Sequence, residues 1–155
     1  MIQVRLLPRR FSALLATTFG LLLMLSTSVM AAQPDLEVNN PRIRWLPGDL
    51  PLAGYMTLHN KGSNPIVMTG ASCDWFGMVM IHESLKENGQ SKMVMRKNFT
   101  VAPGATASFA PGGYHLMLMK RLKPVKVGDQ VPMTLKFSDG SEMTVTFTVQ
   151  GATSS

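Results

Sequence analysis

The chain has 155 residues and a formal net charge of +6, and it contains one cysteine and 13 methionines. A single cysteine excludes an intrachain disulfide framework, and scattered basic residues without neighbouring aromatic clusters argue against a nucleic-acid-binding protein. Three arginines and no acidic residue fall within residues 1–31, so the net charge of the remainder is +3.

Residues 1–31 have the organisation of a secretory signal peptide. Three arginines precede an apolar run that extends from Phe11 to Val29, and small residues follow at Ala31 and Ala32. A basic region, an apolar region and a small-residue cleavage site in this order are typical of an exported protein. We expect cleavage after Ala31, a periplasmic location and no membrane association of the mature chain. The alternative is anchoring through an uncleaved N-terminus, because the apolar run approaches the length of a membrane span.

The remaining residues suffice for one domain with its own core. We expect an extended leader at residues 32–41, the domain at residues 42–150 and a flexible tail at residues 151–155. Short alternating segments bounded by turn residues recur at spacings near ten residues, and no segment keeps a helical period. The sequence therefore predicts an all-β fold, a sandwich or barrel of about eight or nine strands.

Individual strands can be predicted from alternation and turn residues. A short strand is expected at residues 42–46. Residues 52–59 and 66–69 are predicted to form a hairpin, since turn-favouring residues fill most of the connection between them. Residues 131–137 and 143–149 alternate cleanly and are predicted to form another hairpin near the end of the chain.

Three further segments carry methionine or histidine at every second position. They are Met78-Val79-Met80-Ile81-His82, Met93-Val94-Met95 and His115-Leu116-Met117-Leu118-Met119. Alternate side chains of a strand lie on the same face, so each segment predicts one face of sulfur and imidazole groups. Asn88-Gly89 lies between the first two segments and favours a tight hairpin turn, which places His82 and Met93 on adjacent antiparallel strands.

This pattern indicates a copper site with two histidine and two methionine ligands. Thioether sulfur selects Cu(I), and imidazole accepts either oxidation state of copper. Blue-copper electron transfer requires a cysteine ligand, and Cys73 is separate from the three segments. The competing interpretation is that the methionines fill the core, which is the usual role of this residue. Ten of the 13 follow residue 31, more than a small sandwich needs as filler.

Two other residues with metal-binding side chains receive separate predictions. Cys73 is expected to be either a buried apolar residue or a free thiol open to metal binding or intermolecular pairing. His59 precedes a turn and is expected at the surface, with auxiliary metal binding as the alternative. No nucleophile elbow, paired carboxylates or phosphate-binding loop is present, so no enzymatic activity is predicted.

Several motifs together resemble the PCuAC family of periplasmic copper chaperones over residues 42–149. They are Glu83 after His82, the Asn88-Gly89 turn, Met95-Arg96, Val101-Ala102-Pro103-Gly104, Pro111-Gly112-Gly113-Tyr114 before His115, and Lys126-Val127-Gly128-Asp129. The resemblance implies a cupredoxin-like Greek-key β-sandwich that binds one Cu(I) near its surface. It also implies delivery of the ion to the binuclear copper site of cytochrome c oxidase, often with a thioredoxin-like partner.

Carried over by position, the resemblance implies the ligands His82, Met93, His115 and Met117. In the family the ligand methionine directly precedes an Arg-Pro pair, whereas here Met95 precedes Arg96 and Lys97 takes the place of proline. The spacing of ten residues after His82 and twenty-one before His115 selects Met93. Met95, Met119 and Met80 are the alternates or surrounding residues.

The sequence leaves several functional alternatives open. Copper storage or resistance would use the same site as delivery, and a metal-free interaction sandwich of the cell envelope would use the methionines as core and recognition surface. We expect a monomer. Whether Cu(II) binds in addition to Cu(I) does not follow from the residues.

Overall fold

The computed structural model describes residues 34–151, which form an all-β domain without helices in that range. The predicted signal peptide and its cleavage position lie outside the described residues, as do residues 152–155 of the predicted tail. None of the described residues belongs to a helix that could cross a bilayer. The strands are β1 (Leu36–Arg44), β2 (Leu52–Asn60), β3 (Ile66–Ser72), β4 (Phe76–Glu87), β5 (Gln90–Arg96), β6 (Phe99–Val101), β7 (Thr106–Phe109), β8 (Tyr114–Arg121), β9 (Gln130–Phe137) and β10 (Glu142–Gln150).

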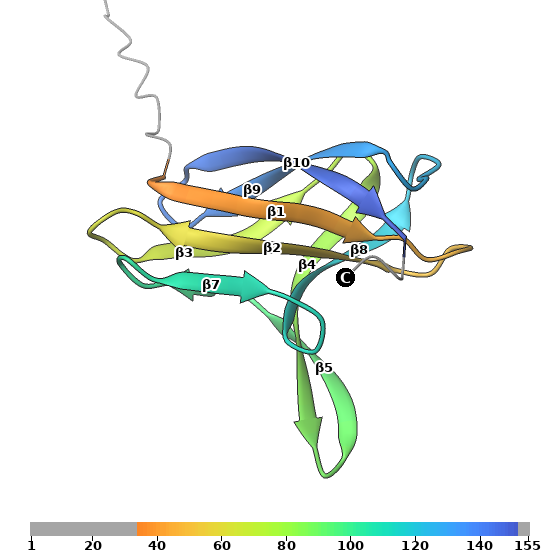
Figure 1. The fold of residues 1–155 in the computed structure, drawn as a ribbon, viewed down its shortest axis with the longest axis horizontal. Coiled ribbons are helices and arrows are strands. Elements are labelled where there is room, and N and C mark those ends of the chain that lie inside the picture. The colour runs from red at the N-terminus through yellow and green to blue at the C-terminus, as the bar shows by residue number, and fades with distance from the viewer. Residues whose placement is uncertain (1–33, 152–155) are drawn as a thin grey trace, which may run out of the picture.

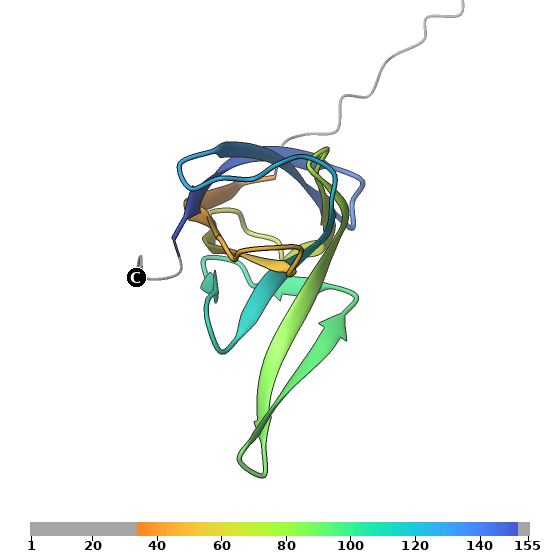
Figure 2. The same ribbon diagram turned by 90° about the vertical axis from the view of Figure 1, so that its right-hand side faces the viewer.

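The ten strands join in one mixed sheet in the order β5-β4-β8-β7-β2-β1-β10-β9-β3-β6, and β8 also pairs with β2. The pairs β1–β10 and β7–β8 are parallel, and the other pairs are antiparallel. Figure 1 shows β5 extending away from the other strands. Figure 2 shows the sheet curling on itself, with the β4–β5 hairpin projecting from the curled body. The predicted all-β class is confirmed.

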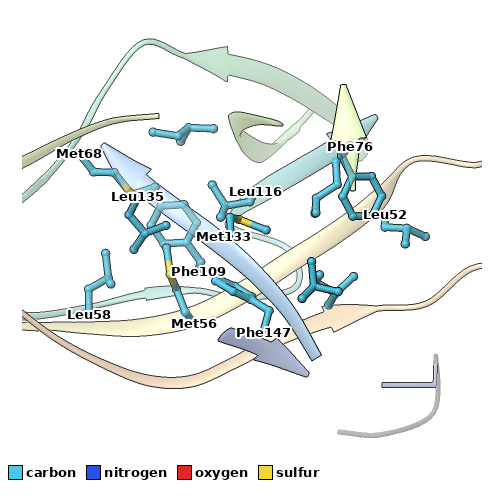
Figure 3. Packing of buried hydrophobic residues seen from close by; sticks show 14 of the residues in the cluster. Leu52, Met56, Leu58, Met68, Phe76, Phe109, Leu116, Met133, Leu135 and Phe147 are labelled. Carbon is cyan, nitrogen blue, oxygen red and sulfur yellow. The ribbon is translucent and has the colours of Figure 1, made fainter. Parts of the chain in front are cut away.

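The interior of the curled sheet is filled by aliphatic and aromatic side chains from nearly every strand (Figure 3). Leu116 and Leu118 of β8 are fully buried, and Ile81 of β4 is almost so. Their neighbours in sequence point to the opposite face, because side chains alternate along a strand. The core therefore fixes which face of β4 and β8 remains outside.

The ten methionines after residue 31 divide clearly between core and surface. Met56, Met68 and Met133 are fully buried in the core, and Met143 packs against it. The remaining six lie on β4, β5 and β8, and all are half-buried or exposed: Met78, Met80, Met93, Met95, Met117 and Met119. Core filling thus accounts for four methionines, and the other six have no role in the core.

One predicted hairpin is wrong. Residues 52–59 do not pair with residues 66–69, because β2 pairs with β1, β7 and β8, while β3 pairs with β6 and β9. The buried side chain of Asn60 accounts for the different path of the connection. Its amide nitrogen donates to the carbonyl oxygens of Asn64 and Val101, and its amide oxygen accepts from the Gly62 backbone N–H. These bonds hold the connecting loop against β6, away from a tight reversal.

The first strand also begins earlier than predicted, at Leu36. Asn39-Asn40-Pro41 was expected to lie in a leader, yet these residues lie within β1 at a register shift between Asn39 and Arg42. Asn40 has a φ of 50°, and asparagine tolerates this left-handed conformation better than most residues. Turn-favouring residues here mark a bulge inside a strand.

Candidate metal centre

The pairing of β4 with β8 brings together two histidines that are far apart in sequence. His82 lies directly opposite His115, and their ring centroids are 5.9 Å apart at an interplanar angle of 62°. Met80 lies opposite Met117, and Met78 opposite Met119. The same outer face of these two strands therefore carries three consecutive cross-strand pairs of sulfur or imidazole side chains.

The β4–β5 hairpin adds the second group of methionines to this face. Asn88 and Gly89 have φ values of 51° and 78°, as a turn with two left-handed residues requires. His82 and Met93 lie on adjacent antiparallel strands, as predicted. The register pairs Met95 with His82 and Met93 with Ser84. Both methionines are more than half exposed, at 54% and 60%.

An open hollow of about 250 Å³ lies on this face. Its lining includes Met93, Ser84, His115 and Met117, together with the Pro111-Gly112 loop. Residues of the β1–β2 region also line it, including Arg44, Ala53 and Tyr55. Met93 thus shares a hollow with His115 and Met117. Met95 does not line this hollow and lies directly opposite His82 across β4 and β5.

The two imidazoles have environments suited to metal binding. His115 is buried, and its Nδ1 lies 3.2 Å from the Gly113 carbonyl oxygen. A carbonyl oxygen only accepts, so Nδ1 of His115 carries the proton and Nε2 keeps its lone pair. His82 has a buried Nδ1 without a hydrogen-bond partner among the described residues. Buried nitrogens are usually satisfied, so this atom is available to a ligand.

The protonation of His82 also favours metal binding. Burial, and in second place the neighbouring His115, lower the pKa of His82 below its usual value of 6.5. The neutral imidazole is the form that binds metals. His82 therefore keeps its metal-binding form to lower pH than an exposed histidine does.

On the opposite face of β4, β5 and β8, the Glu83 carboxylate interacts with residues of the neighbouring strands. Arg96 Nε and Nη2 donate to Glu83 Oε2 over 2.7 and 2.6 Å. Burial and the Glu83 carboxylate raise the pKa of Tyr114, which lies opposite Glu83 across β4 and β8. Glu83 follows His82, Tyr114 precedes His115 and Arg96 follows Met95. This cluster joins β4, β5 and β8 directly behind the sulfur and imidazole groups, and its role was not predicted from the sequence.

The remaining metal-binding side chains lie elsewhere. His59 belongs to β2, and its Nδ1 is 3.0 Å from the Thr106 hydroxyl of β7. The half-buried Cys73 thiol donates to the Pro132 carbonyl oxygen and accepts from the Trp75 backbone N–H. Burial raises the pKa of this thiol. Within residues 34–151, no three His, Cys, Asp or Glu side chains are grouped as a metal site.

Comparison with known proteins assigns the chain to a family. The family model described as "Putative lipoprotein LpqE-like" matches residues 36–149, nearly all of the described domain. The chain belongs to the LpqE-like family. A similarly described protein of Leifsonia xyli subsp. xyli is 34% identical over 99 residues, and the uncharacterized protein RP573 of Rickettsia prowazekii is 29% identical over 94 residues. The matches span 63% and 60% of this chain but only 60% and 52% of the relatives.

Solved structures connect this LpqE-like chain with PCuAC domains. The copper-bound PCuAC domain from PmoF2 is similar with a TM-score of 0.65 and 24% identity, over 78% of this chain and 97% of that domain. The solution structure of CuI-DR1885 from Deinococcus radiodurans is similar with a TM-score of 0.60 and 28% identity, over 81% and 83% of the two chains. The predicted resemblance to the PCuAC family and its fold is confirmed.

Proposed function

We propose that this chain is an exported Cu(I) carrier that binds one ion through His82, Met93, His115 and Met117. The observation that carries the proposal is the cross-strand pairing of His82 with His115 on a face where thioethers surround both imidazoles. Two relatives in fold are solved with copper, and one of them, DR1885, with Cu(I). Export is supported by the signal-like residues 1–31 and by the lipoprotein description of the family.

The donor set fits a carrier because it combines selectivity with easy release. Thioethers and neutral imidazoles select Cu(I) but leave its charge uncompensated. The ion is then held less tightly than by thiolates, and a partner can replace the ligands one at a time. Met93 is more than half exposed, so one ligand can be reached from solvent. We infer that transfer begins on the side of β5.

A copper-acceptor protein of the respiratory chain is the partner we propose, with the binuclear copper site of cytochrome c oxidase as the receiving centre. A thioredoxin-like copper protein is the proposed second partner. Copper storage or resistance is the alternative function, and it uses the same ligands. Mixing the loaded protein with an apo acceptor distinguishes them, because a carrier transfers its ion and a storage protein retains it.

The ligand assignment is tested by a Cu(I) competition titration with a chromophoric chelator. The variant Met93→Leu/Met117→Leu should bind Cu(I) more than about tenfold more weakly, a loss above 1.4 kcal/mol. Met68→Leu is the matched control, because Met68 lies in the core and away from this face. Unchanged affinity of the double variant would exclude this site.

A second measurement separates Met93 from Met95. X-ray absorption of the Cu(I) form counts sulfur and nitrogen ligands, and we expect two of each. Loss of one sulfur in Met93→Leu, but not in Met95→Leu, would support the assignment to Met93. The reverse result would transfer the ligand to Met95, which lies directly opposite His82.

A further inference from the structure

The outer face of β4 and β8 carries more sulfur than a single four-ligand site uses. Beyond His82 and His115, the register pairs Met80 with Met117 and then Met78 with Met119. Met117 lines the hollow described above, whereas Met78, Met80 and Met119 do not. These three residues, together the thioether ladder, form a group next to the proposed site.

Core packing does not account for the thioether ladder. Val79 and Ile81, which alternate with these methionines on β4, pack in or against the core, and Leu116 and Leu118 do so on β8. The ladder lies on the other face and is half-buried. Branched aliphatic residues fit such strand positions better than methionine.

The spacing allows the three sulfur atoms to converge. Directly opposed residues of an antiparallel pair have Cβ atoms about 4.5–5.5 Å apart, and residues two apart on one strand are separated by about 6.8 Å. Methionine has three rotatable side-chain bonds, so its sulfur can cover these separations. Met78, Met80 and Met119 can therefore direct their sulfur atoms to one point.

We propose that Met78, Met80 and Met119 form a second Cu(I) site, weaker than the first and adjacent to it. Three thioethers are soft, neutral ligands that select Cu(I) and other soft monovalent ions such as Ag(I). The site has no imidazole ligand, so the second ion is held more weakly than the first. The Met80–Met117 pair connects the two sites, and an ion can pass between them by exchange of one thioether for another.

This proposal goes beyond the proposed function, because the first site and its carrier role do not require it. The test is an anaerobic titration of the mature protein with Cu(I), repeated with Ag(I), while the methionine methyl groups are followed by NMR. We expect two ions per chain, with the second bound at least about tenfold more weakly than the first because it lacks imidazole ligands. The methyl signals of Met78 and Met119 should shift only with the second ion.

The variant Met78→Leu/Met119→Leu should keep the first ion and lose the second. Leucine nearly conserves the side-chain volume of methionine, so the fold is retained, which thermal denaturation of the metal-free variant verifies. Saturation of the unaltered protein at one ion would overturn the second site and leave the first intact. A second ion that persists in the variant with unchanged affinity would also overturn it, and loss of only the tight ion would refute the carrier site instead.

Discussion

A substitution at Gly54 of β2 tests both the stability of the domain and the position of β8, the strand that carries the proposed ligands His115 and Met117. Gly54 lies opposite Leu116, the residue between His115 and Met117. A Cβ atom at Gly54 would lie 3.2 Å from Leu116 Cβ and 3.4 Å from Leu118 Cδ1. Leu116 is fully buried, and its Cβ is attached directly to the backbone of β8. The substitution Gly54→Ala therefore has to move β8 itself.

The expected loss of stability is the balance of two effects. Overpacking in a well-filled core costs about 1–3 kcal/mol. Replacing glycine by alanine lowers the conformational entropy of the unfolded chain, which stabilises the fold by about 0.4–1 kcal/mol. We expect a net loss of about 1–2 kcal/mol, which in a domain of this size lowers the melting temperature by roughly 4–8 °C. Because His115 and Met117 flank Leu116, Cu(I) affinity should fall as well.

Gly70→Ala is the matched control for this measurement. Gly70 lies in β3, and a Cβ atom there would meet nothing within 4 Å. Its φ is outside the left-handed range, so alanine introduces no backbone strain. We expect unchanged or slightly higher stability in urea denaturation and unchanged Cu(I) affinity. Equal stability of Gly54→Ala and Gly70→Ala would refute the close β2–β8 contact as the constraint on β8.

Two further predictions concern the groups around the site. Because the pKa of His82 is lowered by burial and by His115, the unfolded chain takes up this proton first as pH falls below about 6.5. The metal-free protein should therefore lose stability below that pH. Urea denaturation at pH 7.5 and 5.5 should show a smaller loss for His82→Gln than for the unaltered chain. An equal loss in the two proteins would contradict the direction of the pKa shift. Replacing Glu83 by glutamine removes the charged acceptor of Arg96 and should weaken Cu(I) binding up to about tenfold with an unchanged sulfur count in X-ray absorption. Glu87→Gln, at the exposed end of the hairpin, should bind Cu(I) as the unaltered chain does, and an equal loss in both variants would refute a specific role of Glu83.

Local patterns in the sequence predicted the strands of the candidate site. Alternation of methionine and histidine with aliphatic residues predicted both the strands and the face that these residues share, because strand geometry has a period of two. Asn88-Gly89 predicted the β4–β5 pairing, since its turn type is almost determined by the residues. These features depend on neighbours in sequence.

Features that depend on distant pairing were not predictable in the same way. The register that sets His82 opposite His115 joins strands separated by the whole of β5, β6 and β7. The hairpin predicted from residues 60–65 failed because Asn60 bonds to Val101, far along the chain. Similarly, Glu83 and Arg96 belong to the motifs that resemble the family, but their ion pair follows only from the pairing of β4 with β5.

The position of β5 has a consequence for the rate of copper exchange. β5 is an edge strand that pairs only with β4, and none of its residues is buried. Separation of β5 from β4 breaks one ladder of hydrogen bonds and the Arg96–Glu83 ion pair but exposes no core, so it requires far less free energy than global unfolding. In the proposed site, the sulfur ligand supplied by β5 could then leave the ion while His82, His115 and Met117 keep their places. Partial opening at the sheet edge would limit the lifetime of the bound ion, and the curled sheet would stay folded throughout transfer.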